Sequence, residues 1–324
     1  MNSSWIKIPF SCRFVNFKSK DVALSLPFAV GGATQQGTKH ILDNHNNQDA
    51  LSILIGKEFL LGTLCDGCTS THDEIRDSFS NNEVGAKLIA HIVISNAQKL
   101  LKGTRFNDPD LFVQALSQKT CRQFVTLVKH LAGDDEKERE LFIFDFLMST
   151  IIGFVVTREH YFVFGCGDGI ICINNQITIL QEEAGSYFAA SILPRCCPSM
   201  YTKTTDSNSL KVRYSGITSD LRNIFLATDG FNEIAERFPQ TLIKFINGSI
   251  STRPNGGFDF LLPDFRKQFL GADTIAKYFI TSGWPKDDAS FLLIKRLDPF
   301  TPTPSDVGDQ SLVKESQNDS DKSE

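Results

Sequence analysis

Residues 49–67 read DALSILIGKEFLLGTLCDG, two apolar runs that end on an aspartate followed by glycine. The runs 51–55 and 59–65 are separated by Gly56-Lys57-Glu58, which is the pattern of a β-hairpin. An acid at a strand end can project into a cleft, and a following glycine lets backbone approach closely. The stretch therefore predicts a sheet with a polar site at one end of its strands.

Four aspartates stand at the edges of apolar runs that are far apart in the sequence. Asp49 and Asp66 belong to the hairpin, Asp229 follows the run 224–228, and Asp287 precedes the last strand-like run. Only a folded sheet could gather them. Oxygen ligands are those that Mg²⁺ and Mn²⁺ prefer. The sequence therefore predicts a carboxylate metal centre.

The order of these motifs resembles that of the metal-dependent protein phosphatases of the 2C type, the PPM family. That family has an Asn-x-Asp segment, a strand ending in Asp-Gly, a Gly-Asp hairpin, a second strand ending in Asp-Gly, and an Asp pair that opens a strand. All five motifs occur here in order, the third being Gly165–Gly169. The resemblance covers residues 28 to 297. A single Asp-Gly is usually a turn, whereas five motifs in order are specific.

The resemblance implies a role for each acid. Asp66 would bridge two Mn²⁺ or Mg²⁺ ions, and the Gly67 carbonyl would hold one of them together with Asp49. Asp229 and Asp287 would hold the other ion. Asp66 and Asp229 are accordingly the predicted catalytic acids. The alternative for each aspartate before a glycine is a turn former without a ligand role.

The chain departs from the family pattern at several positions. Gln48 stands where many members have glutamate, and residues 66–70 read Asp-Gly-Cys-Thr-Ser, without the histidine proposed as general acid in some members. Asp168 resembles the acid that joins a third, weaker metal, but Gly169 follows it where serine is usual. These features, with Glu-Val-Gly-Ala over residues 83–86, resemble a divergent bacterial branch.

Position 44 is asparagine, whereas the family usually has a phosphate-binding arginine just before the first aspartate. His40 is the predicted substitute, for phosphate binding or for protonation of the leaving group, because histidine titrates near neutral pH. His45 and His72 are further candidates. The alternative is that all three are loop histidines without a catalytic role.

The resemblance implies hydrolysis of phosphoserine and phosphothreonine in proteins. A phosphate monoester repels hydroxide, so the reaction benefits from two cations ~3.5 to 4 Å apart that neutralise phosphoryl oxygens and acidify a shared water. The sequence has no P-loop and no cysteine in a phosphate-cradling loop, which favours direct attack by that water over a covalent phosphoenzyme. Two alternatives stay open: a pseudophosphatase that acts as an adaptor, and a hydrolase of a small phosphoester.

The composition predicts a soluble, enzyme-sized protein. Of 324 residues, 41% are hydrophobic, enough for a large core, and the net charge of −5 argues against a nucleic-acid or anionic-membrane surface. No apolar run approaches ~18 residues and no signal-peptide core opens the chain. Eight cysteines form no recognisable disulfide framework. We expect a cytoplasmic monomer whose partners are a phosphorylated protein substrate and a cognate kinase.

Strand-like and helix-like segments are segregated along the chain, which indicates the α+β class. The predicted helices are 82–101, 108–131, 233–247 and 272–282, with a charged loop or helix start at 133–140. After residue 149, four short apolar runs at 151–157, 161–166, 170–173 and 176–180 predict an antiparallel meander, and residues 181–223 are polar enough to hold a flap. The closing strand is 291–297.

The resemblance implies a four-layer αββα sandwich, in which two antiparallel β-sheets are flanked by helices. We expect three parts of the chain: an N-terminal extension over 1–27, the phosphatase domain over 28–299, and a polar tail over 300–324. The tail has too little apolar surface to form a core and is predicted to be disordered.

Overall fold

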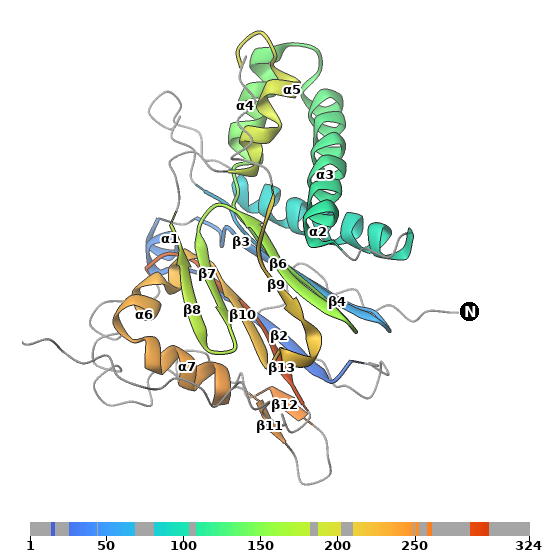
Figure 1. Ribbon diagram of the computed structural model, residues 1–324. Helices are drawn as coiled ribbons and strands as arrows, with labels where there is room; N and C mark the ends of the chain where they lie inside the picture. Colours follow the sequence, from blue (N-terminus) through green and yellow to red (C-terminus); the bar gives the residue numbers. More distant parts are fainter. Residues whose placement is uncertain are drawn as a thin grey trace, which may run out of the picture.

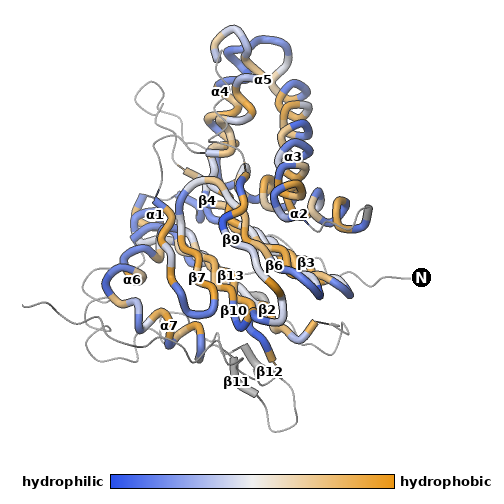
Figure 2. Tube along the Cα trace, viewed as in Figure 1, coloured by the Kyte–Doolittle hydropathy of each residue, from blue (hydrophilic) through white to orange (hydrophobic). Residues whose placement is uncertain are grey.

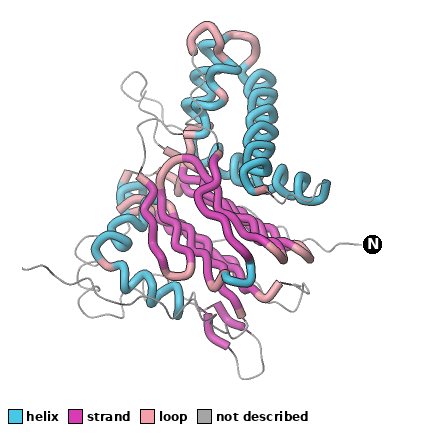
Figure 3. Tube along the Cα trace, viewed as in Figure 1, coloured by secondary structure: helices cyan, strands magenta, loops and turns pink. Residues whose placement is uncertain are grey.

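The computed structural model describes residues 14–16, 26–43, 45–68, 81–103, 108–181, 187–201, 210–248, 250–252, 258–260 and 286–297. Two β-sheets stack face to face and helices cover their outer faces (Figures 1 and 3). The first sheet has the strand order β1-β2-β13-β10-β7-β8, and the second has the order β3-β4-β5-β6-β9. All strand pairs are antiparallel. The predicted α+β sandwich of four αββα layers is confirmed.

The strands are short, and their bounds follow the apolar runs of the sequence. The first sheet consists of β1 (Phe14–Asn16), β2 (Phe28–Gln35), β13 (Ala289–Arg296), β10 (Asn223–Ala227), β7 (Gly169–Ile173) and β8 (Gln176–Leu180). The second sheet consists of β3 (Asp49–Ile55), β4 (Phe59–Asp66), β5 (Ile151–Thr157), β6 (His160–Cys166) and β9 (Lys211–Ile217). A separate pair is formed by β11 (Ile250–Thr252) and β12 (Phe258–Phe260).

Different helices cover the two sheets. Figure 1 shows the longer helices over the second sheet and a shorter pair beside the first. The helices over the second sheet are α2 (Asn82–Gly103), α3 (Pro109–Ala132), α4 (Glu136–Phe146) and the short α5 (Leu193–Cys196). Beside the first sheet lie α6 (Asn232–Arg237) and α7 (Pro239–Gly248), and α1 (Thr38–Leu42) follows β2. Single 3₁₀ turns are η2 (Phe188–Ser191), η4 (Thr218–Asp220) and η5 (Asp229–Phe231).

Three hydrophobic layers hold the sandwich together, and β5 shows how one strand serves two of them. Side chains alternate along a strand, so Phe154 enters the layer between the sheets while Val155 enters the layer under the helices. Both faces of β5 are buried, which explains its unbroken apolar run. Figure 2 shows the same apolar colouring along the central strands. The third layer packs α6 and α7 against the first sheet around Phe225 and Phe291.

Helix boundaries follow local signals. Asp108 accepts hydrogen bonds from the backbone N–H groups of Asp110 and Leu111, as its place before Pro109 predicts. The segment 133–140 is a helix start, because Asp135 caps α4 and the helix continues to Phe146. The predicted single helix 233–247 is wrong: it breaks before Pro239, which lacks the N–H that a helix interior needs.

The predicted four-stranded meander is also wrong. β5 and β6 pair within the second sheet, whereas β7 and β8 pair within the first, so the chain changes sheets between Cys166 and Gly169. The polar segment 181–223 contains strand β9, which pairs with β6. The predicted helix 272–282, the tail from residue 300 and His72 lie outside the described residues. β1 pairs with β2, and the predicted domain boundaries stay predictions.

Candidate active site

Both sheets present strand ends at the same edge of the sandwich. In the second sheet Asp49, at the start of β3, is the register partner of Asp66, at the end of β4. In the first sheet Ala227, at the end of β10, pairs with residues at the starts of β7 and β13. Antiparallel neighbours run in opposite directions, so the end of one strand lies beside the start of the next. Aspartates that are distant in sequence are thereby gathered at this edge.

Asp49 joins the two sheets at their common edge. Its side chain is buried, and Oδ2 accepts a hydrogen bond of 2.9 Å from Thr228 Oγ1, at the end of β10. Its other oxygen, Oδ1, is buried without a hydrogen bond of good geometry in the described residues, although the Ser290 hydroxyl is near enough to lower its pKa. A buried carboxylate oxygen therefore remains available for a ligand.

Asp66 and Asp229 meet across the gap between the sheets. After burial and the charge of Asp49, the charge of Asp229 raises the pKa of Asp66, so the two carboxyl groups lie close together. Asp229 starts η5 directly after β10. A side chain at the next position would not fit, because a Cβ on Gly230 would lie 2.1 Å from the Asp288 carbonyl oxygen. The predicted Asp-Gly signal at position 229 thus reflects close packing of η5 on the Asp288 backbone.

Asp168 lies where the chain crosses from one sheet to the other. Its neighbour Gly169 has φ of 124°, a conformation that residues with a side chain rarely adopt. This conformation explains why glycine replaces the serine that the resemblance leads one to expect. Asp168 is partly buried, and burial raises its pKa. Its negative charge also raises the pKa of Asp229.

The carboxyl groups at this edge disfavour one another's charge. Burial, followed by the charge of Asp288, raises the pKa of Asp49 well above its usual value. Burial, followed by the charges of Asp49 and Asp229, does the same for Asp66. Burial and then the charge of Asp168 raise the pKa of Asp229 to about 6. Like charges gathered in a poorly solvated place account for all three shifts.

Asp287 and Asp288 are adjacent but differ in exposure. The Asp287 side chain is 55% exposed, whereas that of Asp288 is 2% exposed. The Asp288 oxygens accept hydrogen bonds from the backbone N–H groups of Gly37, at 2.7 Å, and Gln48, at 2.5 Å. Asp288 therefore fastens the start of β13 to the segments before α1 and β3.

His40 lies between these two aspartates. Its Nδ1 atom is 2.9 Å from Asp288 Oδ2, although not aligned for a hydrogen bond, and its Nε2 atom is 3.5 Å from Asp287 Oδ1. The ring is buried, and its centroid is 5.9 Å from that of His45. Of the three predicted histidines, the structure thus brings His40 to the acids, with His45 beside it.

We call the set of Asp49, Asp66, Asp168, Asp229, Asp287 and Asp288 the acidic edge. The Gly67 backbone belongs to the same place, since its N–H donates to the Gln48 carbonyl at 3.2 Å and it bridges to Ser149. Sequence analysis missed the structural roles of Asp288 and Thr228. The doubled aspartate was the available signal for Asp288, but only the fold distinguishes the buried member from the exposed one.

The donor set fits a hard divalent cation better than a soft one. It consists of carboxylate oxygens with a backbone carbonyl nearby, and one buried oxygen, Asp49 Oδ1, lacks a well-formed partner. Such oxygens suit Mg²⁺ or Mn²⁺. Within the described residues no three His, Cys, Asp or Glu side chains form a ready-made metal-binding group. The carboxylates are therefore gathered but not converged on a single point.

Comparison with known proteins gives the family. The family model described as "Protein phosphatase 2C" matches residues 36–253 of the 324. The chain belongs to this family, that of the metal-dependent (PPM) phosphatases. No curated protein gives a match to this sequence.

Solved structures that resemble the chain include bacterial phosphatases. A bacterial serine phosphatase is 13% identical, with a TM-score of 0.43 and coverage of 83% of this chain and 98% of that one. The serine/threonine phosphatase Stp1 from Staphylococcus aureus is 13% identical, with a TM-score of 0.45 and coverage of 84% and 96%. The PstP catalytic domain, in complex with two manganese ions, is 11% identical, with a TM-score of 0.43 and coverage of 84% and 99%.

None of the helices in the described part of the chain combines the length and apolar character needed to cross a bilayer.

Proposed function

We propose that the protein is a metal-dependent phosphatase that hydrolyses phosphoserine and phosphothreonine in proteins, with the acidic edge as its active site. The observation that carries the proposal is the gathering of Asp49, Asp66 and Asp229 at one edge of the sandwich, where burial and then neighbouring negative charges raise the pKa values of all three. Such perturbed groups cluster at functional sites. Because the chain belongs to the protein phosphatase 2C family, we interpret these three carboxyl groups as part of a phosphatase active site.

Metal ions explain why the protein tolerates this arrangement. Several carboxylates packed at a poorly solvated edge cost free energy, because each disfavours ionisation of the others. Divalent cations would offset that repulsion. Asp49, Asp66 and the Gly67 carbonyl would hold one ion, and Asp66, Asp229 and Asp287 a second, with Asp168 available to a third. Two Mn²⁺ or Mg²⁺ ions bound there would neutralise phosphoryl oxygens and acidify a water that attacks phosphorus.

The residues around the acids would keep them in place. Thr228 holds Asp49 Oδ2 through its hydroxyl, and Oδ1, which has no well-formed partner in the described residues, would be available to a ligand. Asp288 accepts two backbone hydrogen bonds and so fixes the segment that carries Asp287. His40, buried beside both, would orient Asp287. Protonation of the leaving group by His40 remains a prediction.

The substrate and partners belong to the same proposal. We expect a phosphorylated protein as substrate, a kinase that opposes the enzyme, and a monomer as the working form. The adaptor alternative and the small-phosphoester alternative predict different turnover, so one set of assays separates all three.

The test uses purified full-length protein with p-nitrophenyl phosphate, a panel of phosphoserine and phosphothreonine peptides, and small phosphoesters, each with Mn²⁺ and with excess chelator. We expect turnover of the peptides that requires the metal. Full activity after exhaustive chelation would contradict the metal mechanism. Turnover confined to small phosphoesters would contradict the protein substrate, and absence of all turnover would favour the adaptor.

A further inference from the structure

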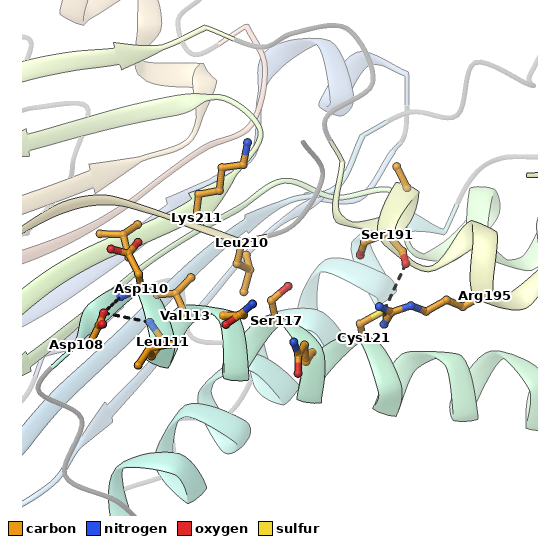
Figure 4. Close-up of a pocket in the computed structure, with 14 residues that line it drawn as sticks. Asp108, Asp110, Leu111, Val113, Ser117, Cys121, Ser191, Arg195, Leu210 and Lys211 are labelled. Atoms are coloured by element: carbon orange, nitrogen blue, oxygen red, sulfur yellow. Dashed lines mark hydrogen bonds between the residues drawn. The ribbon is translucent and has the colours of Figure 1, made fainter. Parts of the chain in front are cut away.

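A pocket of about 650 Å³ lies outside the acidic edge, between α3, η2 with α5, and the start of β9 (Figure 4). One face of α3 supplies most of its wall. Ser117, Gln118 and Cys121 come from the middle of that face, Ser191 and Arg195 from the opposite wall, and Leu210 from the segment before β9. The pocket therefore combines hydroxyl, amide, apolar and cationic groups.

Charge is distributed unevenly along this pocket. Figure 4 shows Arg195 at one end, beside Cys121 and Ser191, and Asp108 with Asp110 at the other end. The Arg195 Nη1 atom donates a hydrogen bond of 2.9 Å to Cys121 Sγ. Burial raises the pKa of the Cys121 thiol despite the nearby guanidinium, so the thiol does not neutralise Arg195 near pH 7.

Arg195 is exposed and forms no ion pair with any carboxylate in the described part of the chain. A guanidinium has donors enough to bind a carboxylate as well as the thiol. At the far end the charge is mixed, because Lys211 lines the pocket together with Asp108 and Asp110. The Arg195 end is thus suited to one acidic side chain of a ligand.

The pocket is close to the acidic edge along two connections. Lys211, in its wall, is the register partner of Gly165 in β6, and Asp168 lies three residues further along the chain. The other wall starts at Phe188, whose N–H donates to the Ser149 carbonyl at 3.3 Å, and Ser149 bridges to Gly67. Three residues span at most ~10 Å and adjacent strands are ~5 Å apart. Arg195 itself lies seven residues after Phe188 in η2 and α5, which adds at most ~14 Å at ~2 Å per helical residue. An extended peptide therefore covers the distance between Arg195 and Gly67 in about seven residues.

We propose that this pocket is a substrate-recognition subsite, in which Arg195 binds an acidic side chain that lies within about seven residues of the phosphorylated residue. The inference rests on the proposed function, since it assumes a phosphoprotein bound at the acidic edge. It adds a sequence preference that the acidic edge alone would not impose. The apolar and amide walls would accommodate the peptide segment that connects the acid with the phosphorylated residue.

The test is a positional scan of phosphoserine peptides. One aspartate or alanine is placed at each position from seven residues before the phosphoserine to seven after it, and kcat/KM is measured with Mn²⁺ for the wild type and R195A. We expect the wild type to prefer aspartate at one position or two adjacent positions by about tenfold, the usual value of one charge-assisted hydrogen bond. R195A should lose that preference and keep its kcat/KM for the alanine peptides.

A charge reversal and a matched control make the result decisive. R195E should prefer lysine at the same position, and R158A should behave like the wild type, because Arg158 lies in the β5–β6 turn and pairs with Glu58. Turnover of p-nitrophenyl phosphate and the melting temperature should be the same in all variants. An absence of acidic preference in the wild type, or an equal loss in R195A for acidic and alanine peptides, would overturn the subsite. Failure of p-nitrophenyl phosphate turnover in the wild type would instead overturn the proposed function.

Discussion

The two ends of the sandwich both carry charged residues where strands end, but the charges differ in exposure and in the sign of their neighbours. At the turn end, Glu58 and Arg158 are 67% and 57% exposed and form an ion pair of 3.8 Å between two hairpins. At the acidic edge, Asp49 and Asp288 are buried, and the negative charge of Asp288 raises the pKa of Asp49. Opposite charges meet in water at one end, and like charges meet away from water at the other.

This difference indicates which end of the sandwich lowers the free energy of unfolding in the metal-free protein. An exposed ion pair contributes between 0 and about 1 kcal/mol, and its loss is tolerated. A group of buried like charges costs free energy in the metal-free protein, and it is tolerated where ligands restore the balance. Substitutions at the two ends should therefore differ in size and, for several acids, in sign.

The largest effect is expected at Asp229. D229N should reduce Mn²⁺-dependent turnover of p-nitrophenyl phosphate by about a thousandfold or more, because it removes a proposed ligand and a proposed catalytic charge. The metal-free protein should be as stable as the wild type or slightly more stable, because the repulsion decreases. Turnover and melting with and without Mn²⁺ are the measurements. A destabilised variant with normal turnover would remove Asp229 from the site.

The next effect is expected at Asp288. D288A would leave the backbone N–H groups of Gly37 and Gln48 without their acceptor, so we expect a loss of about 3 kcal/mol in the free energy of unfolding. D287A is the matched control one residue away. It should change metal-free stability by less than about 1 kcal/mol, because that side chain is 55% exposed. Urea unfolding of both variants measures these changes. Equal losses in the free energy of unfolding would contradict the structural role assigned to Asp288 alone.

The third effect concerns pH. The pKa of Asp229 is about 6 in the folded protein against a usual 3.8. Between these two pH values the carboxyl group is mostly protonated in the folded state and mostly ionised in the unfolded state. Stability from this group is present below about pH 4 and decreases as the pH rises through 6, by about 3 kcal/mol in total. The raised pKa values of Asp49 and Asp66 add contributions of the same sign.

Unfolding in urea with chelator between pH 4.5 and 7.5 measures this decrease. The slope should be smaller in D229N than in the wild type. An identical pH dependence in the two proteins would show that folding does not raise the pKa of Asp229.

The smallest effect is expected at the turn end. E58Q should change the free energy of unfolding by no more than about 0.5 kcal/mol and leave turnover unchanged, since it removes one exposed ion pair. A decrease of more than about 1 kcal/mol in the free energy of unfolding, measured by the same urea titration, would contradict the small contribution assigned to this exposed ion pair.

The sequence singled out the acids of the proposed site because each stands at the edge of an apolar run, and all but Asp49 stand beside glycine or a second acid. Asp66 and Asp229 close their strands as expected, and the α+β sandwich follows from the family resemblance and the segregated elements. It was harder to predict to which of the two sheets each strand belongs. Every residue of β7 is buried, so its pattern contains no alternation that would assign a face or a neighbour.

Other elements were missed for physical reasons that lie outside local sequence. β2 contains two consecutive glycines, which weaken a strand signal, yet it pairs with β13 along its whole length. β9 is an exposed edge strand with few apolar side chains. The burial of Asp288 depends on contacts with Gly37 and Gln48, which are 251 and 240 residues away in the chain.

The most direct test of the central claim is a calorimetric titration of Mn²⁺ into the chelator-treated protein at pH 6, in two buffers with different enthalpies of ionisation. We predict binding of two ions with net release of protons, because carboxyl groups with raised pKa values must ionise to become ligands. D66N should bind fewer ions and release fewer protons. Binding without proton release, or binding unchanged in D66N, would contradict the assignment of the acidic edge as the metal centre.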